Sequence, residues 1–572
     1  MKQLTKSVAD LIIQSLKNAQ SAGDLPEFEI PHIKVESPKR EGQGDYAFPA
    51  MQLSKLGKKN PRVIAEDIVK HLPDSDFMEK VEVAGPGFIN FFITDDYVKK
   101  QVEVILEEGQ NFFTLDIGKG KKAQVEFVSA NPTGPIHVGR TRGGVIGDTM
   151  ARLLEAAGYE VQREYYFNNA GNQMVMLGES LKVRYLQELG DAIELNENHY
   201  QGEYLIDYAK EIIAEHGDSW RDKDWETFKE FTEQKMFGWI KKSLKAIDIE
   251  HDNFFNEDSL FQNEDVWETL ADLKKNGYVY EAVHWNGASE EEIAESKATE
   301  PAQWFATSKF GDAKDRVMVK ADGIPTYTLP DIAYHRNKIQ RGFDIMVNVL
   351  GADHGQQYQT VSWGIEALGL DPSGIHVILN QLVRMVVTDP ETGEKVEKKG
   401  STRKGIYDTL DDMVRDTSAD AIRYHLLAYA PTTHITFDVE EVTKQSNDNP
   451  VYYIQNAHVR CCGIFREAEE RGFTDEGADL SLLGEDELKF IRKAMELGDI
   501  IEHTVNTYEP HRIAFFAQEL ASLFHPTYDR VRVLHSEVPE DVAKARLRFY
   551  KSAQVVFERV LRLMGMTTPE RM

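Results

Sequence analysis

The chain carries, at residues 129–140, the sequence Ser129-Ala-Asn-Pro-Thr-Gly-Pro-Ile-His-Val-Gly-Arg140, a turn rich in proline and glycine that holds one histidine. The residues just before it, 123–128, have the apolar character of a short buried strand. After it, apolar residues recur at helical spacing from Val145 to Ala157, and Gly158 stands where a helix is expected to end. The order predicts a strand, a turn and a helix, which is the arrangement that binds ligands at the carboxyl ends of strands in open α/β sheets.

The turn has features that suit a nucleotide phosphate. A helix N-terminus offers unpaired N–H groups and the positive end of the helix dipole. His137 adds a possible hydrogen bond, and Gly139 allows a close approach to the backbone. We interpret the turn as an ATP site; taken alone, it is equally compatible with a tight turn that contains a structural histidine.

Length and composition limit the classes of protein. A chain of 572 residues is too long for one core and predicts three or four domains. Hydrophobic residues make up 41% and charged residues 28%, there is no apolar run of about 18 residues and the N-terminus does not resemble a signal peptide, so a cytoplasmic protein without membrane contact is expected. The only cysteines, Cys461 and Cys462, are adjacent, so no zinc site is expected. The net charge of -29 disfavours nonspecific nucleic-acid binding but leaves room for local basic patches.

Residues 1–112 predict an α+β domain. It starts with an amphipathic helix, a second helix begins at Pro61, and two strands flank the turn Gly85-Pro-Gly87. Basic residues lie near two aromatic residues, Tyr46 and Phe48, a combination that suits looped RNA. On composition alone, a solvated lysine face over a small α+β core is the simpler explanation.

Residues 113–425 predict the nucleotide-binding domain. A strand at Val161–Phe167 is followed by the polar run Asn168–Gln173, which either lines the pocket or forms a loop. An acidic, helical insertion is expected at about 175–300, after which the sheet continues with strands at 316–320, 345–350 and 377–379. Gly351–Gln359 then forms a second ligand-facing turn, although its polar residues also suit helix capping.

A hairpin follows, with strands at 382–387 and from Glu394, and it leads into the basic loop 398–405. Such a loop can neutralise charge on phosphates during transfer, or it is simply a lysine-rich loop tip. Residues 426–572 become almost wholly helical and predict a bundle.

Four segments together resemble the arginyl-tRNA synthetases, a class I aminoacyl-tRNA synthetase family, along the whole chain. They are 44–47 with 83–90, 125–148, 327–335 with 351–355, and 448–455 through Phe524-His525 to the last residues. The resemblance implies a multidomain α/β protein: an N-terminal α+β tRNA-binding domain, a Rossmann-type catalytic domain with an insertion, and a C-terminal all-α anticodon-binding bundle.

The resemblance also implies roles around ATP. His137-Val-Gly-Arg140 matches the His-Ile-Gly-His motif of the class, with Arg140 in place of the second histidine. Lys399-Gly-Ser-Thr402 stands at the Lys-Met-Ser-Lys loop and lacks the final lysine, whose charge Arg403 or Lys404 can supply. The implied catalytic residues are His137, Arg140, Lys399, Arg403 and Lys404. The implied ATP-binding residues are Pro132, Gly134, His137, Gly139, Arg140, Gly351, Asp353, His354 and Ser401.

The implied substrate is L-arginine, which is joined to tRNA(Arg) at the expense of ATP. Its guanidinium has five donors in a rigid fork and therefore requires carboxylates in a planar hydrogen-bonding frame. Asp331 is expected to bind the guanidinium, and Glu126 either its other edge or the α-amino group. The full implied set of arginine-binding residues is Glu126, Ser129, Asn131, His137, Tyr327, Asp331 and Gln359.

The resemblance further implies that Mg²⁺ accompanies ATP, that no protein-bound metal is needed, and that the molecule is a monomer. Contacts to tRNA are expected at Tyr46 and Phe48 in the first domain and at Tyr453 and Asn456 in the last. Other readings are another class I synthetase, a nucleotidyltransferase, or a tRNA-binding relative without catalysis, which the departures at Arg140 and Thr402 would explain. The pair Tyr327 and Asp331 favours an arginine-activating enzyme over all of these.

Overall fold

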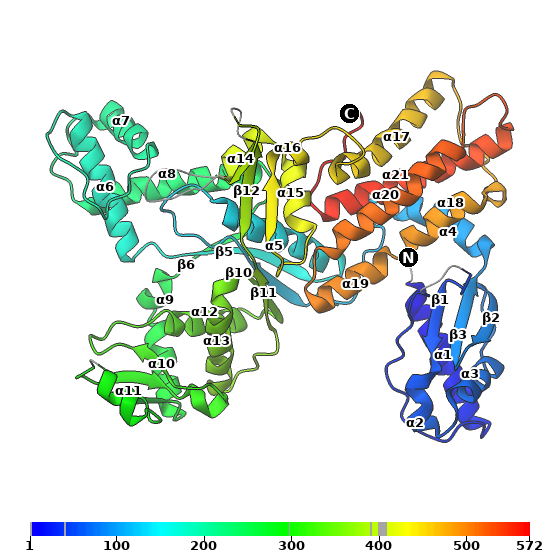
Figure 1. Cartoon of the computed structure of the whole chain (residues 1–572), viewed down its shortest axis with the longest axis horizontal. Coiled ribbons are helices and arrows are strands. Elements are labelled where there is room, and N and C mark those ends of the chain that lie inside the picture. The colour runs from blue at the N-terminus through cyan, green and yellow to red at the C-terminus, as the bar shows by residue number, and fades with distance from the viewer. Residues whose placement is uncertain (1–2, 39–41, 297, 389–391, 398–408) are drawn as a thin grey trace.

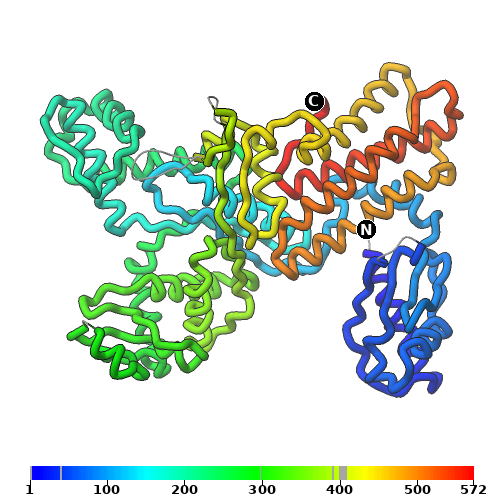
Figure 2. The backbone as a smooth tube through the Cα atoms, viewed as in Figure 1, coloured from blue at the N-terminus to red at the C-terminus, as the bar shows by residue number. Residues whose placement is uncertain are grey.

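The computed structural model describes residues 3–38, 42–296, 298–388, 392–397 and 409–572. Figures 1 and 2 show a central α/β body with a helical bundle packed on one side and three smaller units extending away from it. In this view the N-terminal unit lies below the bundle, and the other two units extend from the opposite side of the central body. The basic loop of the hairpin lies outside the described residues.

The N-terminal unit is a three-stranded antiparallel sheet, in the order β1-β3-β2, covered by helices. It confirms the predicted helix at the start, the helix from Pro61 and the two strands around the glycine-rich turn. Its elements are α1 (Leu4–Ser21), β1 (Tyr46–Pro49), α2 (Ser54–Gly57), α3 (Pro61–Lys70), β2 (Met78–Ala84), β3 (Phe88–Ile93) and, leading to the central body, α4 (Asp95–Glu108).

The central body contains a five-stranded parallel sheet in the order β11-β10-β4-β5-β6. Its strands are β4 (Lys122–Glu126), β5 (Glu160–Phe167), β6 (Asn253–Asn256), β10 (Ile345–Gly351) and β11 (Ile375–Asn380). Helix α5 (Val138–Ala156) follows β4, as predicted, and it packs so closely on the sheet that a Cβ at Gly147 would lie 2.3 Å from the ring of Phe127. Glycine is therefore required where this helix crosses the strand end.

Two units, rather than one insertion, interrupt the sheet. The first is helical, with α6 (Asn172–Glu188), α7 (Tyr204–His216) and α8 (Trp225–Lys245), after which the chain returns to the sheet edge as β6. The second contains an antiparallel sheet, in the order β7-β8-β9, so residues 316–319 belong to this separate sheet and not to the central one. Its elements are α9 (Asp258–Gln262), α10 (Asp265–Lys275), β7 (Val279–Ala282), α11 (Glu290–Glu295), β8 (Ala302–Phe305), β9 (Arg316–Val319) and α12 (Thr328–Gln340), which leads to β10. Helix α13 (Gly355–Ala367) joins β10 to β11 and packs on α12.

The predicted hairpin is present as β12 (Val383–Thr388) and β13 (Lys395–Glu397). Strand β14 (Ile435–Asp438) pairs in parallel with β12, so this small sheet continues beyond residue 425, where the helical domain was expected to begin. The helices around it are α14 (Leu410–Asp416), α15 (Ala419–Leu427) and α16 (Val439–Val442).

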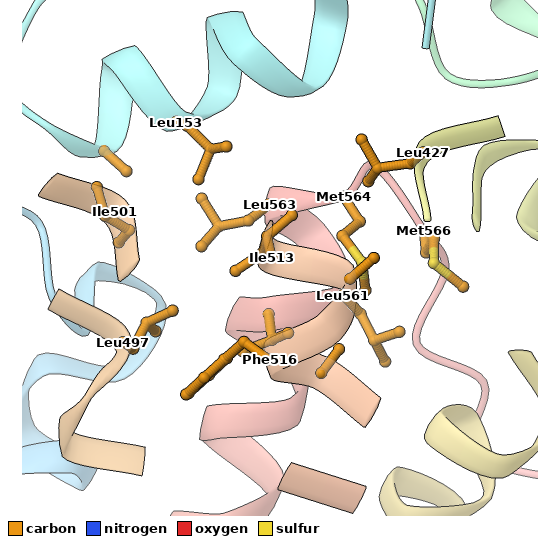
Figure 3. Close-up of a cluster of buried hydrophobic side chains, with 14 of the residues drawn as sticks. Leu153, Leu427, Leu497, Ile501, Ile513, Phe516, Leu561, Leu563, Met564 and Met566 are labelled. Carbon is orange, nitrogen blue, oxygen red and sulfur yellow. The ribbon is translucent and has the colours of Figure 1, made fainter. Parts of the chain in front are cut away.

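The helical bundle starts at Pro450. It consists of α17 (Pro450–Glu470), α18 (Glu485–Met495), α19 (Leu497–Thr507), α20 (Arg512–Arg530) and α21 (Glu540–Leu563). Its core is continuous with the core of the central body: Figure 3 shows Leu153 of α5 facing Leu563 and Met564 at the end of α21, with Ile513 of α20 beside them. The bundle is thus packed directly on the helix that follows the Pro/Gly-rich turn.

Candidate functional site

The turn between β4 and α5 is held in an unusual backbone conformation. Val128 and Ser129 have φ values of 68° and 40°, which are uncommon for residues other than glycine. His137 caps α5, because its Nδ1 accepts a hydrogen bond from the N–H of Gly139 at 3.1 Å. In the neutral ring the proton therefore sits on Nε2, which makes this atom a donor. The histidine has both a structural role and a donor atom directed away from its own helix end.

Two cavities meet at His137 and Arg140. One, of 730 Å³, is lined by the turn itself and by α6, and includes Asn131, Gly134 and Gln173. The other, of 520 Å³, lies between α5 and the end of β10. It brings together residues from both predicted ligand-facing turns, namely His137, Gly139, Arg140, Gly351, Asp353 and His354. Both volumes fall in the range of small-molecule sites.

Arg140 is exposed, and its Nη1 donates a long hydrogen bond, of 3.5 Å, to the carbonyl of Val128. Asp353 is likewise exposed on a short 3₁₀ turn, η4 (Ala352–His354). Pro132 is buried in the turn and lines neither cavity. The cavity walls therefore carry two charged groups, Arg140 and Asp353, whose contacts with other protein groups are long.

Glu126, at the end of β4, is buried and ion-paired. Lys338 Nζ donates to its Oε2 at 2.7 Å, and Ser129 Oγ donates to its Oε1 at 3.1 Å. Lys338 also donates to Asn348 Oδ1 of β10 at 2.6 Å, and its side chain is wholly buried. The lysine neutralises one carboxylate and ties β4, α12 and β10 together.

Two further acidic side chains lie near Glu126, around the ring of Tyr166. Glu257, just after β6, accepts hydrogen bonds from Tyr166 Oη and from Asn168 Nδ2, both at 2.7 Å. Asp331, on the first turn of α12, accepts a hydrogen bond from Gln357 Nε2. We call Glu126, Glu257 and Asp331 the carboxylate cluster.

The cluster has perturbed acidities. Burial, together with the charges of Glu257 and Glu126, raises the pKa of Asp331 to about 7. Burial also raises the pKa of Glu257. Three acidic groups with one buried lysine leave an excess of negative charge, so the cluster is suited to a cation with several hydrogen-bond donors.

The structure brings most of the predicted arginine-binding residues to this region. Asn131 donates to Gln173 Oε1 and accepts from the N–H of Asn168, both at 3.0 Å, so it orders the polar run after β5. Tyr327 precedes α12 by one residue, but its side chain is 80% exposed and stands at the rim. Gln359 is exposed and does not face the cluster; Gln357 contacts Asp331 instead, because two residues along a helix turn the side chain by about 200°.

Glu257, Lys338 and Gln357 were missed by the sequence reasoning. Glu257 directly follows a strand of the central sheet, so the rule that placed ligands at carboxyl ends of strands would have found it had β6 been recognised. Lys338 had no comparable signal, because it lies within a helix, 212 positions from its partner.

The two predicted tRNA contacts in the N-terminal unit are wrong. Tyr46 is 6% exposed and Phe48 is fully buried, because all of β1 is packed in the interior, and Arg492 and Met495 of the bundle lie beside Tyr46 at the end of the strand. Neither ring can stack on a base. In the bundle, Tyr453 is half-buried with its ring centroid 4.3 Å from that of His525, and Asn456 is half-buried on the same helix.

The expected catalytic loop residues Lys399, Ser401, Arg403 and Lys404 lie outside the described residues. Within the described part of the chain, no three His, Cys, Asp or Glu side chains gather in a way that would hold a metal ion. No helix among these residues combines the length and the apolar character needed to cross a membrane.

Family models match consecutive parts of the chain. They are described as arginyl tRNA synthetase N terminal domain (residues 6–93), tRNA synthetases class I (R), catalytic domain (residues 101–427) and DALR anticodon binding domain (residues 454–572). Arginine–tRNA ligases of Carboxydothermus hydrogenoformans and Oceanobacillus iheyensis are 40% and 38% identical, with 100% of both chains covered in each case. The solved arginyl-tRNA synthetase of Thermus thermophilus covers 100% of both chains with a TM-score of 0.74 and 19% identity, a likeness of fold.

Proposed function

We propose how the residues of this chain, which belongs to the arginyl-tRNA synthetase family, divide the two steps of arginine–tRNA ligation. In the first step the carboxylate of L-arginine attacks the α-phosphorus of ATP, and pyrophosphate leaves. In the second, the terminal ribose hydroxyl of tRNA attacks the adenylate carbonyl, and AMP leaves. The carboxylate is already a nucleophile, so the work of the enzyme is to position the substrates and to stabilise charge.

The carboxylate cluster is the observation that supports arginine as the substrate. Asp331 accepts the guanidinium, with Gln357 in the place first given to Gln359, and Tyr327 closes over it from the rim. Glu126 accepts the α-amino group, or the other edge of the guanidinium, held in place by Lys338 and Ser129. A lysine ammonium cannot fill several fixed acceptors at once, and acceptors left without a donor penalise it.

The N-terminus of α5 binds ATP. Its backbone N–H groups and dipole favour phosphate, Nε2 of His137 donates to it, and Arg140 replaces a histidine donor with a longer cation. Pro132 and Gly134 shape the turn, and Gly139, Gly351, Asp353 and His354 line the nucleotide side. Mg²⁺ would be held by the ATP phosphates with Asp353 as an available oxygen ligand, and it would neutralise the charge of the leaving pyrophosphate.

The remaining roles belong to the basic loop and to the RNA-facing surfaces. Lys399, Ser401, Arg403 and Lys404 supply cations and a hydroxyl to the phosphates during transfer. Tyr453 and Asn456 on α17 contact the anticodon stem-loop, and the N-terminal unit contacts tRNA through residues other than Tyr46 and Phe48. The active species is a cytoplasmic monomer.

ATP–pyrophosphate exchange across the twenty amino acids, with and without tRNA, tests this proposal. We expect exchange with arginine and with no other amino acid, and only when tRNA is present. Exchange with arginine in the absence of tRNA would agree with the site assignments, but it would show that arginine activation does not depend on tRNA. No exchange in either condition, from protein that still binds tRNA, would contradict the catalytic roles given to the turn and to the loop.

A further inference from the structure

A buried arginine, Arg423, joins helix α5 to the C-terminal end of helix α21. Arg423, on α15, is 0% exposed, and its guanidinium contacts three other segments. Nε donates to the carbonyl of Met564 at 2.6 Å, Nη1 to that of Ile247 at 2.7 Å, and Nη2 to Asp148 Oδ2 at 2.5 Å. One side chain thus links the end of α21, the end of the helical unit and the middle of α5.

Asp148 is the acceptor on the catalytic helix. It lies on α5, the helix that begins beside His137, and only 1% of its side chain is exposed. Arg152 Nε also donates to Asp148 at 2.7 Å, while Arg152 Nη1 and Nη2 reach the carbonyl of Arg562 at 3.3 Å and that of Asp248 at 2.9 Å. The helix is therefore tied to α21 by two arginines in parallel.

The end of α21 is shaped to admit the Arg423 guanidinium. Gly565 has a φ of 68°, and a Cβ there would lie 2.1 Å from Arg423 Cζ. Apolar contacts support the same junction, because Leu153 of α5 faces Leu563 and Met564 (Figure 3). The junction is therefore close-packed as well as ionic.

We infer that Arg423 is a positioning residue, which couples the anticodon-binding bundle to the helix that binds ATP. The inference rests on the proposed function of α5 and of the bundle. A shift of α21 relative to α5 would separate a fully buried guanidinium from its carboxylate or from its carbonyl acceptors, and such a separation is unfavourable in a dry interior. If a ligand at either site moves α5 or α21, the other element has to move with it, and occupancy of one site then alters affinity at the other.

A coupling measurement with the full chain tests this inference. The dissociation constant of tRNA(Arg) is measured at one salt concentration, with and without a saturating sulfamoyl analogue of arginyl-adenylate, and the ratio is the coupling factor. For wild type we expect a factor within the range of about 5–150 that is typical of allosteric proteins. Arg423→Lys keeps the charge but cannot reach three acceptors, so the factor should fall below about 2. Each ligand alone should still bind.

Two matched variants make the test decisive. Arg548→Lys alters an ion-paired arginine on the same helix α21, whose partners are Glu103 at 2.9 Å and Asp475 at 3.2 Å, remote from α5. It should keep the wild-type factor. Arg152 is the partly exposed arginine of the same junction, so Arg152→Lys should also lower the coupling factor. This variant tests the inference if Arg423→Lys does not fold.

A wild-type factor of 1, or an unchanged factor in a variant with the wild-type melting temperature, would overturn the inference. Failure of the proposed function gives a different result, since the wild type would then not bind the adenylate analogue at all.

Discussion

The carboxylate cluster and the nucleotide turn (residues 129–140) meet at Ser129 but are built in opposite ways. In the cluster, Glu126, Glu257 and Asp331 each accept a hydrogen bond from a neighbouring side chain, and the ion pair of Glu126 is buried. In the cavity that the turn lines, Arg140 of the turn and Asp353 of η4 are exposed and have only weak partners. On the roles proposed above, the groups that recognise the amino acid are already held in place inside the protein, whereas the groups that contact phosphate would gain their main partners only when ATP binds.

If the cluster is prearranged for a guanidinium, Asp331→Asn should have the largest effect of any single change. It removes a buried charge that faces the guanidinium, and sites of this kind lose about 10³-fold or more in kcat/KM. Arginine-dependent pyrophosphate exchange measures the loss. A reduction below tenfold would show that the selectivity lies elsewhere.

The melting temperature of Asp331→Asn serves as the control for this variant. Asp331 has a raised pKa, so between its unfolded value near 3.8 and about 7 the folded state binds the extra proton, and stability falls as pH rises through that window. Asn removes this penalty. The variant should therefore melt at a higher temperature than wild type at pH 8, although its kcat/KM is about 10³-fold lower.

Lys338→Met should show the next largest effect, because it leaves Glu126 buried without its cation. Breaking one partner of a buried pair costs about 3–5 kcal/mol of folding stability. Denaturant unfolding should detect this loss. Adding Glu126→Gln removes the orphaned charge, so the double variant should regain most of the stability but not the activity. If the double variant is no more stable than the single one, the pair is not the source of the loss.

Arg140→Ala tests the other side of the comparison. A weakly held, exposed cation that contacts ATP contributes about one charge-assisted hydrogen bond, so we expect KM for ATP to rise about tenfold, with little change in melting temperature or in KM for arginine. Arg140→His, which restores the residue of the family motif, should lie near wild type. Equal changes in both KM values would mean that the turn and the cluster are one coupled site.

The last expected effect, similar in size to that of Arg140→Ala, is on the pH dependence of arginine binding. Below about pH 7 the protonated Asp331 cannot accept a guanidinium charge, so KM for arginine should rise as pH falls, by up to about tenfold per pH unit, and level off above 7. KM for ATP, set by the exposed turn, should not follow this curve. Steady-state exchange between pH 6 and 8.5 separates the two profiles, and Asp331→Asn should abolish the arginine slope.

The elements that the sequence predicted are mostly those formed by residues close to one another in the chain. The strand, the capped turn and α5 follow one another within 40 residues, and the hairpin is equally compact. The carboxylate cluster is only half-visible in the sequence, because Glu257 depends on recognising β6, a strand of four half-buried residues with no clear periodicity. Tyr46 and Phe48 were misplaced because an aromatic residue near lysines looks the same in the sequence whether its ring is exposed or packed in the core.

The strand order has a consequence for how the protein is made. Strand β4, which ends at Glu126, pairs with β5 on one side and with β10, which starts at Ile345, on the other. A ribosome adding about 5–20 residues per second needs roughly 11–44 s to produce the chain between β4 and β10. Throughout that interval one edge of β4 stays unpaired, although β5 can already cover the other. An open strand edge invites pairing with other chains, so nascent copies are most prone to aggregate while the two interrupting units are being synthesised.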